Sequence, residues 1–191
     1  KESKRAAILT HCPSKEWAND SYATPETFLE LSLENGHFIA VGPYYQYPDD
    51  GHLTANGYRA HGCKIAQVDH IVSDLKQGWQ PMHSFRQHHR GNYAVMLYHV
   101  PFGAVAFSPS VDGLEYYDPA DKGYTWSDSS GALTILSVTS PYSNLVMFEF
   151  HRDVVGTLTW KYADVAHGGQ GSVHDTDPFV PMFNYEIGSY T

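Results

Sequence analysis

The sequence predicts an α/β portion over residues 1–78, followed by an antiparallel β-sandwich over residues 79–191. Before Gly78, short apolar runs alternate with segments whose apolar residues recur every three or four positions, a pattern typical of strands and helices in turn. After Gly78 the helical spacing disappears, and short runs of alternating polarity are separated by clusters rich in Gly, Pro, Asn and Asp. The expected fold class is therefore α/β plus all-β.

The α/β portion is expected to contain a strand, a helix and a second strand. Residues 6–10 form a short apolar run that is typical of a buried strand. Thr24 can cap a helix whose first position is Pro25, and Gly36 marks its end. Residues 38–41 form the next strand. At this spacing the unit is a parallel βαβ unit, whose functional loop belongs at the carboxyl end of the second strand.

The loop after that strand contains an acid and a histidine three positions apart, Asp49 and His52. A carboxylate this close can fold back onto the imidazole, fix its tautomer and stabilise the imidazolium that forms when the ring accepts a proton. Asp50 is the competing acid, and its position is more typical of a solvated turn residue. The simpler alternative is that Asp49 caps a turn and His52 is an ordinary polar loop residue.

A second helix is expected after this loop. Thr54 can cap it, and an apolar stripe should continue to about Leu75 and end before Gly78. The stripe consists of Tyr58, Gly62, Ile65, Val68, Val72 and Leu75. Such a helix would pack on the sheet and hold the loop of His52 against it.

Residues 49–62 resemble the last sequence block of the SGNH (GDSL-type) hydrolases, a family of serine esterases and carbohydrate O-deacetylases. The block reads Asp-x-x-His-Leu-Thr-x-x-Gly-Tyr-Arg-x-x-Gly, and it is similar to the subset in bacterial and phage proteins with a β-domain after the hydrolase. The resemblance implies that residues 1–78 are the C-terminal portion of a flavodoxin-like (SGNH) parallel sheet. It also implies that His52 is a general base, that Asp49 orients it, and that the substrate is an O-acetylated polysaccharide.

Enzymes of this family also need a serine nucleophile in a Gly-Asp-Ser turn, with oxyanion donors from a Gly and an Asn. The sequence contains no Gly-Asp-Ser, and Ser14, Ser21 and Ser32 lack the strand-turn-helix context of an exposed nucleophile. Loss of a triad serine costs on the order of 10⁶ in turnover, so the chain alone should not be a competent esterase. We expect the serine and the leading strands of the sheet to come from an upstream segment, a cleaved partner or a neighbouring chain.

In the sandwich, strands are expected at residues 93–100, 104–107, 114–117, 133–138, 145–150 and 158–162. Residues 178–187 resemble the closing strand of the same phage and bacterial group. Aromatic residues of this portion could stack on sugar faces, although in a sandwich most such residues belong to the core. The examples are Tyr116, Tyr117, Tyr124 and Trp126.

Two sets of polar residues could hold a cation, and the first, which could suggest a metal, has no matched acid or Cys spacing. They are His83, His88 and His89, and His174, Asp175 and Asp177. Solvated strand-end histidines are the better interpretation of the first set, and no cofactor is expected. The Gly-rich residues 167–171 lack the preceding strand and following Lys of a phosphate-binding loop, so we expect a flexible loop.

Composition limits the partners. The chain has 191 residues, and its 12 Lys and Arg against 21 Asp and Glu give a net charge of −9. Nucleic acid and anionic membranes are bound through basic patches, so neither is an expected partner. No apolar run approaches the roughly 20 residues of a membrane span. Cys12 and Cys63 are both expected to be small buried residues, although a bridge between them stays open.

A second function from another class stays open. The chain could be a non-catalytic structural or glycan-binding component of a virion, such as a phage tail or capsid-surface protein, or of a cell-surface assembly. Both functions imply a glycan as ligand, an extracellular or virion-associated location, and an oligomer or larger assembly.

Overall fold

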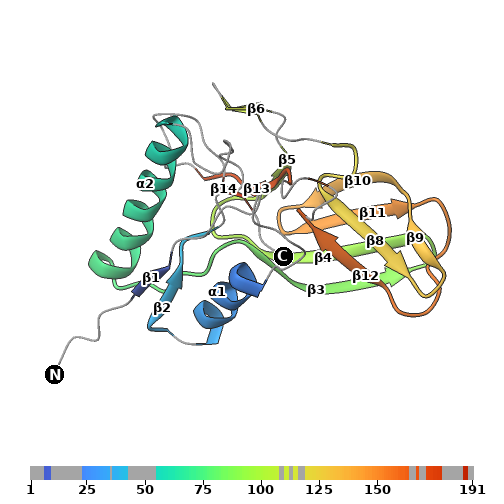
Figure 1. Cartoon of the computed structure of the whole chain (residues 1–191), viewed down its shortest axis with the longest axis horizontal. Coiled ribbons are helices and arrows are strands. Elements are labelled where there is room, and N and C mark those ends of the chain that lie inside the picture. The colour runs from blue at the N-terminus through green and yellow to red at the C-terminus, as the bar shows by residue number, and fades with distance from the viewer. Residues whose placement is uncertain are drawn as a thin grey trace.

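The computed structural model describes residues 7–9, 23–34, 36–42, 55–107, 110–111, 114–115, 119–163, 167, 171–177 and 187–188. Within these residues the fold is mostly antiparallel β-sheet with two helices (Figure 1). The helices and the first two strands lie at one end of the molecule, and the longer strands form the other end (Figure 1).

Strands β1 (Ala7–Leu9) and β2 (Phe38–Ala40) pair in parallel, and helix α1 (Ala23–Glu34) connects them along the chain. The predicted strand–helix–strand unit is therefore confirmed. The helix begins at Ala23, so Thr24 lies in its first turn and is not the residue before it, a shift that the high helix propensity of alanine explains. A pair of three-residue strands does not amount to a flavodoxin-like sheet, and that part of the fold stays a prediction.

Side chains satisfy both backbone groups of Ala40, at the end of β2. The N–H of Ala40 donates to Ser32 Oγ at 3.2 Å, and its carbonyl oxygen accepts from Trp79 Nε1 at 2.9 Å. The N–H and C=O of one strand residue point to the same edge. This edge of β2 therefore faces α1 and Trp79.

Helix α2 (Ala55–Asp69) continues into one π-helical turn, η1 (His70–Asp74), and the chain leaves the helix at Leu75 as the sequence predicts. Its packed face meets the buried Ile39 and Val41 through Val68, which is fully buried. The ends of the predicted stripe do not belong to this face. Tyr58 is 57% exposed and Leu75 is 50% exposed, because the stripe drifts around the helix over its length.

The expectation for Cys63 was wrong. Its thiol is free and the residue is exposed, because the neighbouring Lys64 occupies the buried side of α2. Cys12 lies outside the described residues.

The longer strands form two antiparallel sheets in the described part of the chain. One has the order β10-β11-β4-β3, with bounds Ile135–Tyr142, Leu145–Phe150, Tyr93–His99 and His83–Arg90. The other has the order β12-β8-β9, with bounds Thr159–Tyr162, Tyr124–Asp128 and Gly131–Leu133. Met96 and Phe148 from the first sheet and Trp126 from the second belong to one buried core, so the sheets pack face to face. The predicted antiparallel sandwich is present.

Shorter strands complete the described β structure. Strands β5 (Val105–Phe107), β13 (Val173–Asp175) and β14 (Ile187–Gly188) form a sheet of order β14-β13-β5, and β6 (Ser110–Val111) pairs with β7 (Leu114–Glu115). Neither helix of the described chain is both long enough and apolar enough to cross a membrane.

One strand prediction needs correction, and several strands of the structure, β6 and β13 among them, were not predicted. Residues 133–138 are not one strand, because Thr134 separates β9 from β10 and its N–H donates to His151 Nδ1 at 3.0 Å. Strands β3 and β8 were not predicted at all. The aromatic residues Tyr124 and Trp126 of β8 are 2% and 1% exposed, so they are core and cannot stack on a sugar. Tyr116 and Tyr117 lie outside the described residues.

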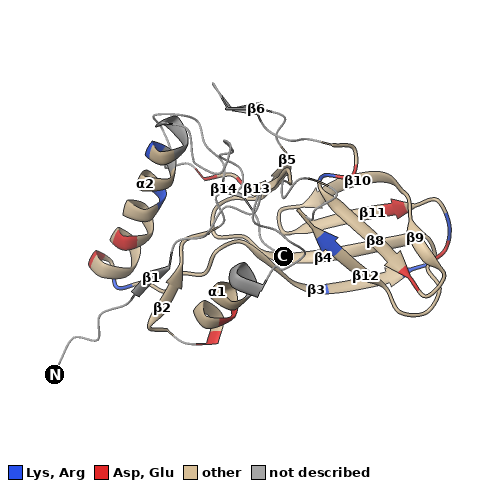
Figure 2. Cartoon of the chain, viewed as in Figure 1, with Lys and Arg blue, Asp and Glu red and all other residues tan. Residues whose placement is uncertain are grey.

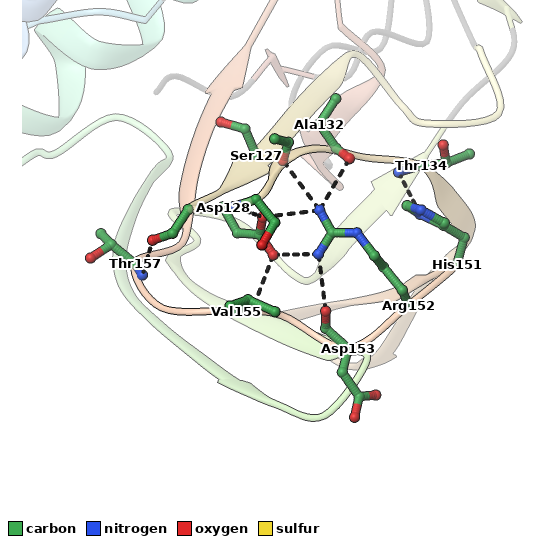
Figure 3. A network of polar contacts seen from close by, with 12 residues as sticks. Ser127, Asp128, Ala132, Thr134, His151, Arg152, Asp153, Val155 and Thr157 are labelled. Carbon is green, nitrogen blue, oxygen red and sulfur yellow. Dashed lines mark hydrogen bonds and ion pairs between the residues drawn. The ribbon is translucent and has the colours of Figure 1, made fainter.

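A polar network closes the far end of the sandwich (Figure 3). The Arg152 guanidinium donates to both carboxylate oxygens of Asp128, at 2.5 and 2.9 Å, and the Val155 N–H donates to the same carboxylate at 2.8 Å. The Asp128 side chain is fully buried in this network. The hydrogen bonds from Arg152 hold the pKa of Asp128 well below its ordinary value of 3.8, against the opposing effect of burial.

We expect Asp128→Asn to lower the urea midpoint at pH 7, because the paired form of Asp128 is the ionised one. A depressed pKa stabilises the fold at pH values above 3.8 and loses that effect as the pH falls toward the folded-state pKa. The gap between wild type and Asp128→Asn should therefore shrink below about pH 4. Asp153→Asn is the control, since Arg152 contacts only the Asp153 carbonyl. Equal midpoints for wild type and Asp128→Asn at pH 7 would contradict the role of the network.

Candidate functional site

The predicted pair Asp49 and His52 lies in a loop outside the described residues, as does the competing Asp50, so their placement stays a prediction. The described residues on both sides define where this loop starts and ends. Strand β2 leads into Val41 and Gly42, which are both buried, and α2 begins at Ala55. The loop therefore leaves the carboxyl end of β2 and returns to the start of α2.

A buried lysine on α2 is the centre of a polar cluster in the described part of the chain. Basic and acidic positions both occur along α2 (Figure 2). Of its charged residues, Arg59 and Asp69 are exposed, whereas the Lys64 side chain is only 5% exposed. Lys64 Nζ lies 3.3 Å from Asp177 Oδ2 and donates to Gln67 Oε1 at 2.8 Å. Gln67 Nε2 in turn donates to Asp177 Oδ1 at 3.0 Å.

Two aromatic rings enclose the ammonium group. Lys64 Nζ lies 4.5 Å from the centroid of the Trp79 ring and 4.6 Å from that of Phe102. At this distance the negative face of each ring attracts the cation, and the attraction is stronger when water is excluded. Trp79 is held in turn by its hydrogen bond to the carbonyl of Ala40. The cluster thus ties α2 and β2 to the segment that contains Asp177.

The environment of Lys64 changes its proton affinity. Burial lowers the pKa of Lys64 to about 8 from the ordinary 10.5, and the nearby charges of Asp177 and Asp175 partly oppose the shift. Asp175 is fully buried. The sequence suggested a cation site at His174, Asp175 and Asp177. In the structure the ammonium of Lys64 is the cation that interacts with Asp177 and Asp175. In the described residues, no group of three or more His, Cys, Asp or Glu side chains could hold a metal ion.

This pKa predicts a pH dependence of stability. Between about pH 8 and 10.5 the unfolded chain binds more protons at Lys64 than the folded chain does, so the free energy of unfolding should rise with pH. Urea unfolding of wild type and Lys64→Met at several pH values in this window isolates the effect. The difference in unfolding free energy, wild type minus variant, should increase with pH. Parallel pH profiles would contradict the assignment.

A cavity of about 600 Å³ lies beside this cluster, between α1, β2, η1 and the chain after β4. Trp79 and Phe102 line it as well as contacting Lys64. Phe38 and Ile39 line it from the beginning of β2, and the predicted loop leaves the opposite end of that strand. We therefore do not assign the cavity to the predicted Asp49–His52 site.

The first histidine of β3 is buried, whereas the sequence predicted solvated histidines at these positions. His83 is buried, and its ring lies 5.4 Å from that of His99, so it is not a solvated strand-end residue. Burial and the neighbouring His83 lower the pKa of His99, while a hydrogen bond with the backbone of Gln80 opposes the shift. His88 and His89 are exposed, as expected.

Two described histidines lie beside a carboxylate. His70 Nδ1 is 2.7 Å from Asp74 Oδ2, but both side chains are more than half exposed, and such a pair contributes little. His167 Nε2 lies 3.2 Å from Asp121 Oδ2, and the His167 side chain is buried. Of the loop predicted at 167–171, the structure describes only His167 and Gly171; Gly171 is also buried and packs against the Tyr162 ring. The flexibility of the loop stays a prediction.

Sequence reasoning missed Lys64, Trp79 and Phe102. A lysine on a stripe of apolar residues was the available signal for Lys64, since lysine is almost never buried without a partner. The partner, Asp177, is 113 positions away in the sequence. No local pattern could have indicated it.

Comparison with known proteins gives one informative likeness. No family model matches the chain, and no curated protein matches it. Among solved structures, the crystal structure of XAC1771, described as a novel carbohydrate acetylesterase from Xanthomonas citri, is similar with a TM-score of 0.51 and 11% sequence identity. The likeness covers 81% of this chain and 33% of that chain, so the present chain spans about a third of that protein's length. The chain therefore shares its fold with part of an acetylesterase.

Proposed function

We propose that the chain is part of an SGNH-type serine esterase that removes O-acetyl groups from a polysaccharide. In this proposal residues 1–78 belong to the hydrolase portion, residues 79–191 form the sandwich domain, and the serine nucleophile lies outside the 191 residues. His52 is the general base and Asp49 its orienting acid. The protein acts outside the cell or on a virion, as part of an oligomer or larger assembly.

One observation carries the proposal. The loop with Asp49 and His52 leaves the carboxyl end of the second strand of a parallel βαβ unit, and α2 follows it directly. Open α/β sheets build their sites from the loops at this end of the strands. The shared fold with part of a carbohydrate acetylesterase supports the same reading.

The chemistry follows from these roles. His52 accepts the serine proton as the serine oxygen attacks the acetyl carbonyl carbon, and Asp49 stabilises the resulting imidazolium. The tetrahedral oxyanion collapses, the C–O bond to the sugar breaks, and the imidazolium returns its proton to the sugar oxygen. Water then attacks the acetyl-enzyme with His52 again as base, the C–O bond to the serine breaks, the imidazolium returns its proton to the serine oxygen, and acetate leaves.

Labelling of the full-length protein with a fluorophosphonate tests the proposal. An activated serine displaces fluoride and forms a bond to phosphorus, and mass spectrometry of the peptides identifies that serine. We expect the label on a serine in a Gly-Asp-Ser turn outside these 191 residues. A label on a serine within them, or no label at all, would overturn the proposal.

A non-catalytic role is the second candidate, and the absence of Gly-Asp-Ser from the sequence favours it. In that role the chain is a structural or glycan-binding component of a virion or cell-surface assembly. Absence of fluorophosphonate labelling together with retained glycan binding is the result expected for this candidate.

A further inference from the structure

The sandwich is open to solvent along one side. In the described part of the chain, β3 ends one sheet and β12 ends the facing sheet. Gln87 of β3 pairs with Met96, and Trp160 of β12 pairs with Trp126. Directly opposed residues lie on the same face of a sheet, and Met96 and Trp126 are both in the shared core. Gln87 and Trp160 therefore point between the sheets.

The side chains at these two inward positions are not buried as core side chains are. Gln87 is exposed and Trp160 is half-buried, although both face the interior side of their sheets. A cavity of about 270 Å³ occupies this side. We call it the β3–β12 mouth, and it is lined by Ser84, Phe85, Arg86, Gln87, Met96 and Trp160.

Two features present aromatic surface to the β3–β12 mouth. The pairing of β3 with β4 shifts between Ser84 and Arg86, and Phe85 at this irregularity is 59% exposed. Such bulges redirect side chains and are frequent next to binding sites. The Trp160 ring is supported from the core side, with its centroid 6.3 Å from that of Trp126. Trp160 is therefore a fixed platform with one accessible side.

The polar groups of the β3–β12 mouth indicate which kind of ligand could bind against Trp160. Gln87 offers an amide that donates and accepts, Ser84 offers a hydroxyl, and Arg86 offers a guanidinium. No carboxylate is among its lining residues, so the mouth lacks the ligands that a cation requires. An aromatic platform with an amide, a hydroxyl and a guanidinium beside it matches a ring with one apolar face and many hydroxyl groups.

We propose that the β3–β12 mouth binds a sugar ring of a polysaccharide. The C–H face of the ring stacks on Trp160 and Phe85, and its hydroxyl groups bond to Gln87, Ser84 and Arg86. The volume of about 270 Å³ lies just below that of sites for drug-sized ligands, which suits one ring of a chain that continues outside. The choice of a polysaccharide rests on the proposed function, whereas the location rests on the geometry of the sandwich.

Affinity electrophoresis of the full-length protein tests this site. The gels contain acetylated xylan, deacetylated xylan, glucomannan or pectin, so that acetylated, neutral and acidic polymers are compared. At least one should retard the wild type. Trp160→Ala and Phe85→Ser should each weaken that binding about tenfold, as expected for the loss of one aromatic contact. Phe85→Ser is included because Phe85 is exposed and its loss should leave the fold intact.

Tyr142→Ala is the matched control. Tyr142 is 71% exposed and lies in β10, at the opposite end of the same sheet from β3. Its loss should leave retardation unchanged. Wild-type migration unaffected by every polymer, or equal retardation of all three variants and the wild type, would overturn the site.

The same gels are run in the His52→Ala background, so that retardation is read without ester hydrolysis. Loss of binding in Trp160→Ala supports the site whether or not the protein hydrolyses 4-nitrophenyl acetate, which is measured separately with His52 in place. Hydrolysis by a wild type that none of the polymers retards would overturn the site and leave the catalytic proposal standing. Retardation of a protein that shows no fluorophosphonate label would leave the site standing and overturn the catalytic proposal.

Discussion

Replacing His52 by alanine in the full-length protein should reduce kcat for 4-nitrophenyl acetate by roughly 10⁴- to 10⁶-fold, the range expected when the base of a triad is removed. Without the imidazole, the serine hydroxyl has no acceptor for its proton during the attack, and the water that attacks the acetyl-enzyme has none either. Asp49→Asn should cost somewhat less, on the order of 10⁴-fold, because the imidazole remains but loses the carboxylate that fixes its tautomer. Initial rates at saturating substrate measure both effects.

Asp50→Ala is the control for this experiment, since Asp50 is adjacent to Asp49 in the sequence but has no assigned role. Its kcat should stay close to that of the wild type. A wild type and a His52→Ala variant with the same kcat would eliminate the esterase mechanism. A loss of kcat in Asp50→Ala with none in Asp49→Asn would instead assign the orienting role to Asp50.

Replacing Lys64 by methionine should destabilise the fold at pH 7 by less than the about 3–5 kcal/mol of a broken buried pair, because the lowered pKa of Lys64 shows that burial already offsets much of the attraction of its acidic partners. Asp177 would keep Gln67 as a hydrogen-bond donor but would lose the ammonium at 3.3 Å. Asp175, which is fully buried, would lose the attraction of the same charge. Urea unfolding followed by tryptophan fluorescence gives the free energy of unfolding.

Lys161→Met is the matched control, because Lys161 is an exposed lysine in β12 and its loss should change stability by no more than about 0.5 kcal/mol. Adding Asp177→Asn to Lys64→Met should recover part of the loss, since one of the unpaired charges is then removed. Equal stability of the wild type and Lys64→Met would show that the ion pair and the two rings do not stabilise the fold. An additive double variant would show that Lys64 and Asp177 are not coupled.

The sequence was informative where a local period controls the structure. The strand–helix–strand unit, α2 and strands β4 and β11 follow from spacing that one apolar face imposes. Strand β3 was missed because it is an edge strand in the described sheet, with six consecutive exposed residues from Phe85 to Arg90 and no alternation to read. Edge positions tolerate polar side chains on both faces, so periodicity fails there.

The candidate sites show the same limit. Asp49 and His52 could be proposed because they lie three positions apart and a short motif surrounds them. Lys64 and its partner could not be proposed, because residues 113 positions apart meet only after the sheets form. The β3–β12 mouth could not be proposed either, since Gln87 and Trp160 face each other only through the registers of two different sheets. A sequence shows directly which residues are spaced for one face or one loop, but it does not show which distant residues meet in the fold.

The capping of Ala40 by Ser32 and Trp79 has a consequence for how the parallel layer can grow. A strand arriving on that flank of β2 would find the N–H and C=O of Ala40 already bonded to a hydroxyl and an indole. The side of β1 away from β2 has no such block in the described residues, so we expect a further strand of the proposed hydrolase to join the layer there. A cross-link introduced beside β1 is therefore the place to capture the segment that supplies the proposed nucleophile.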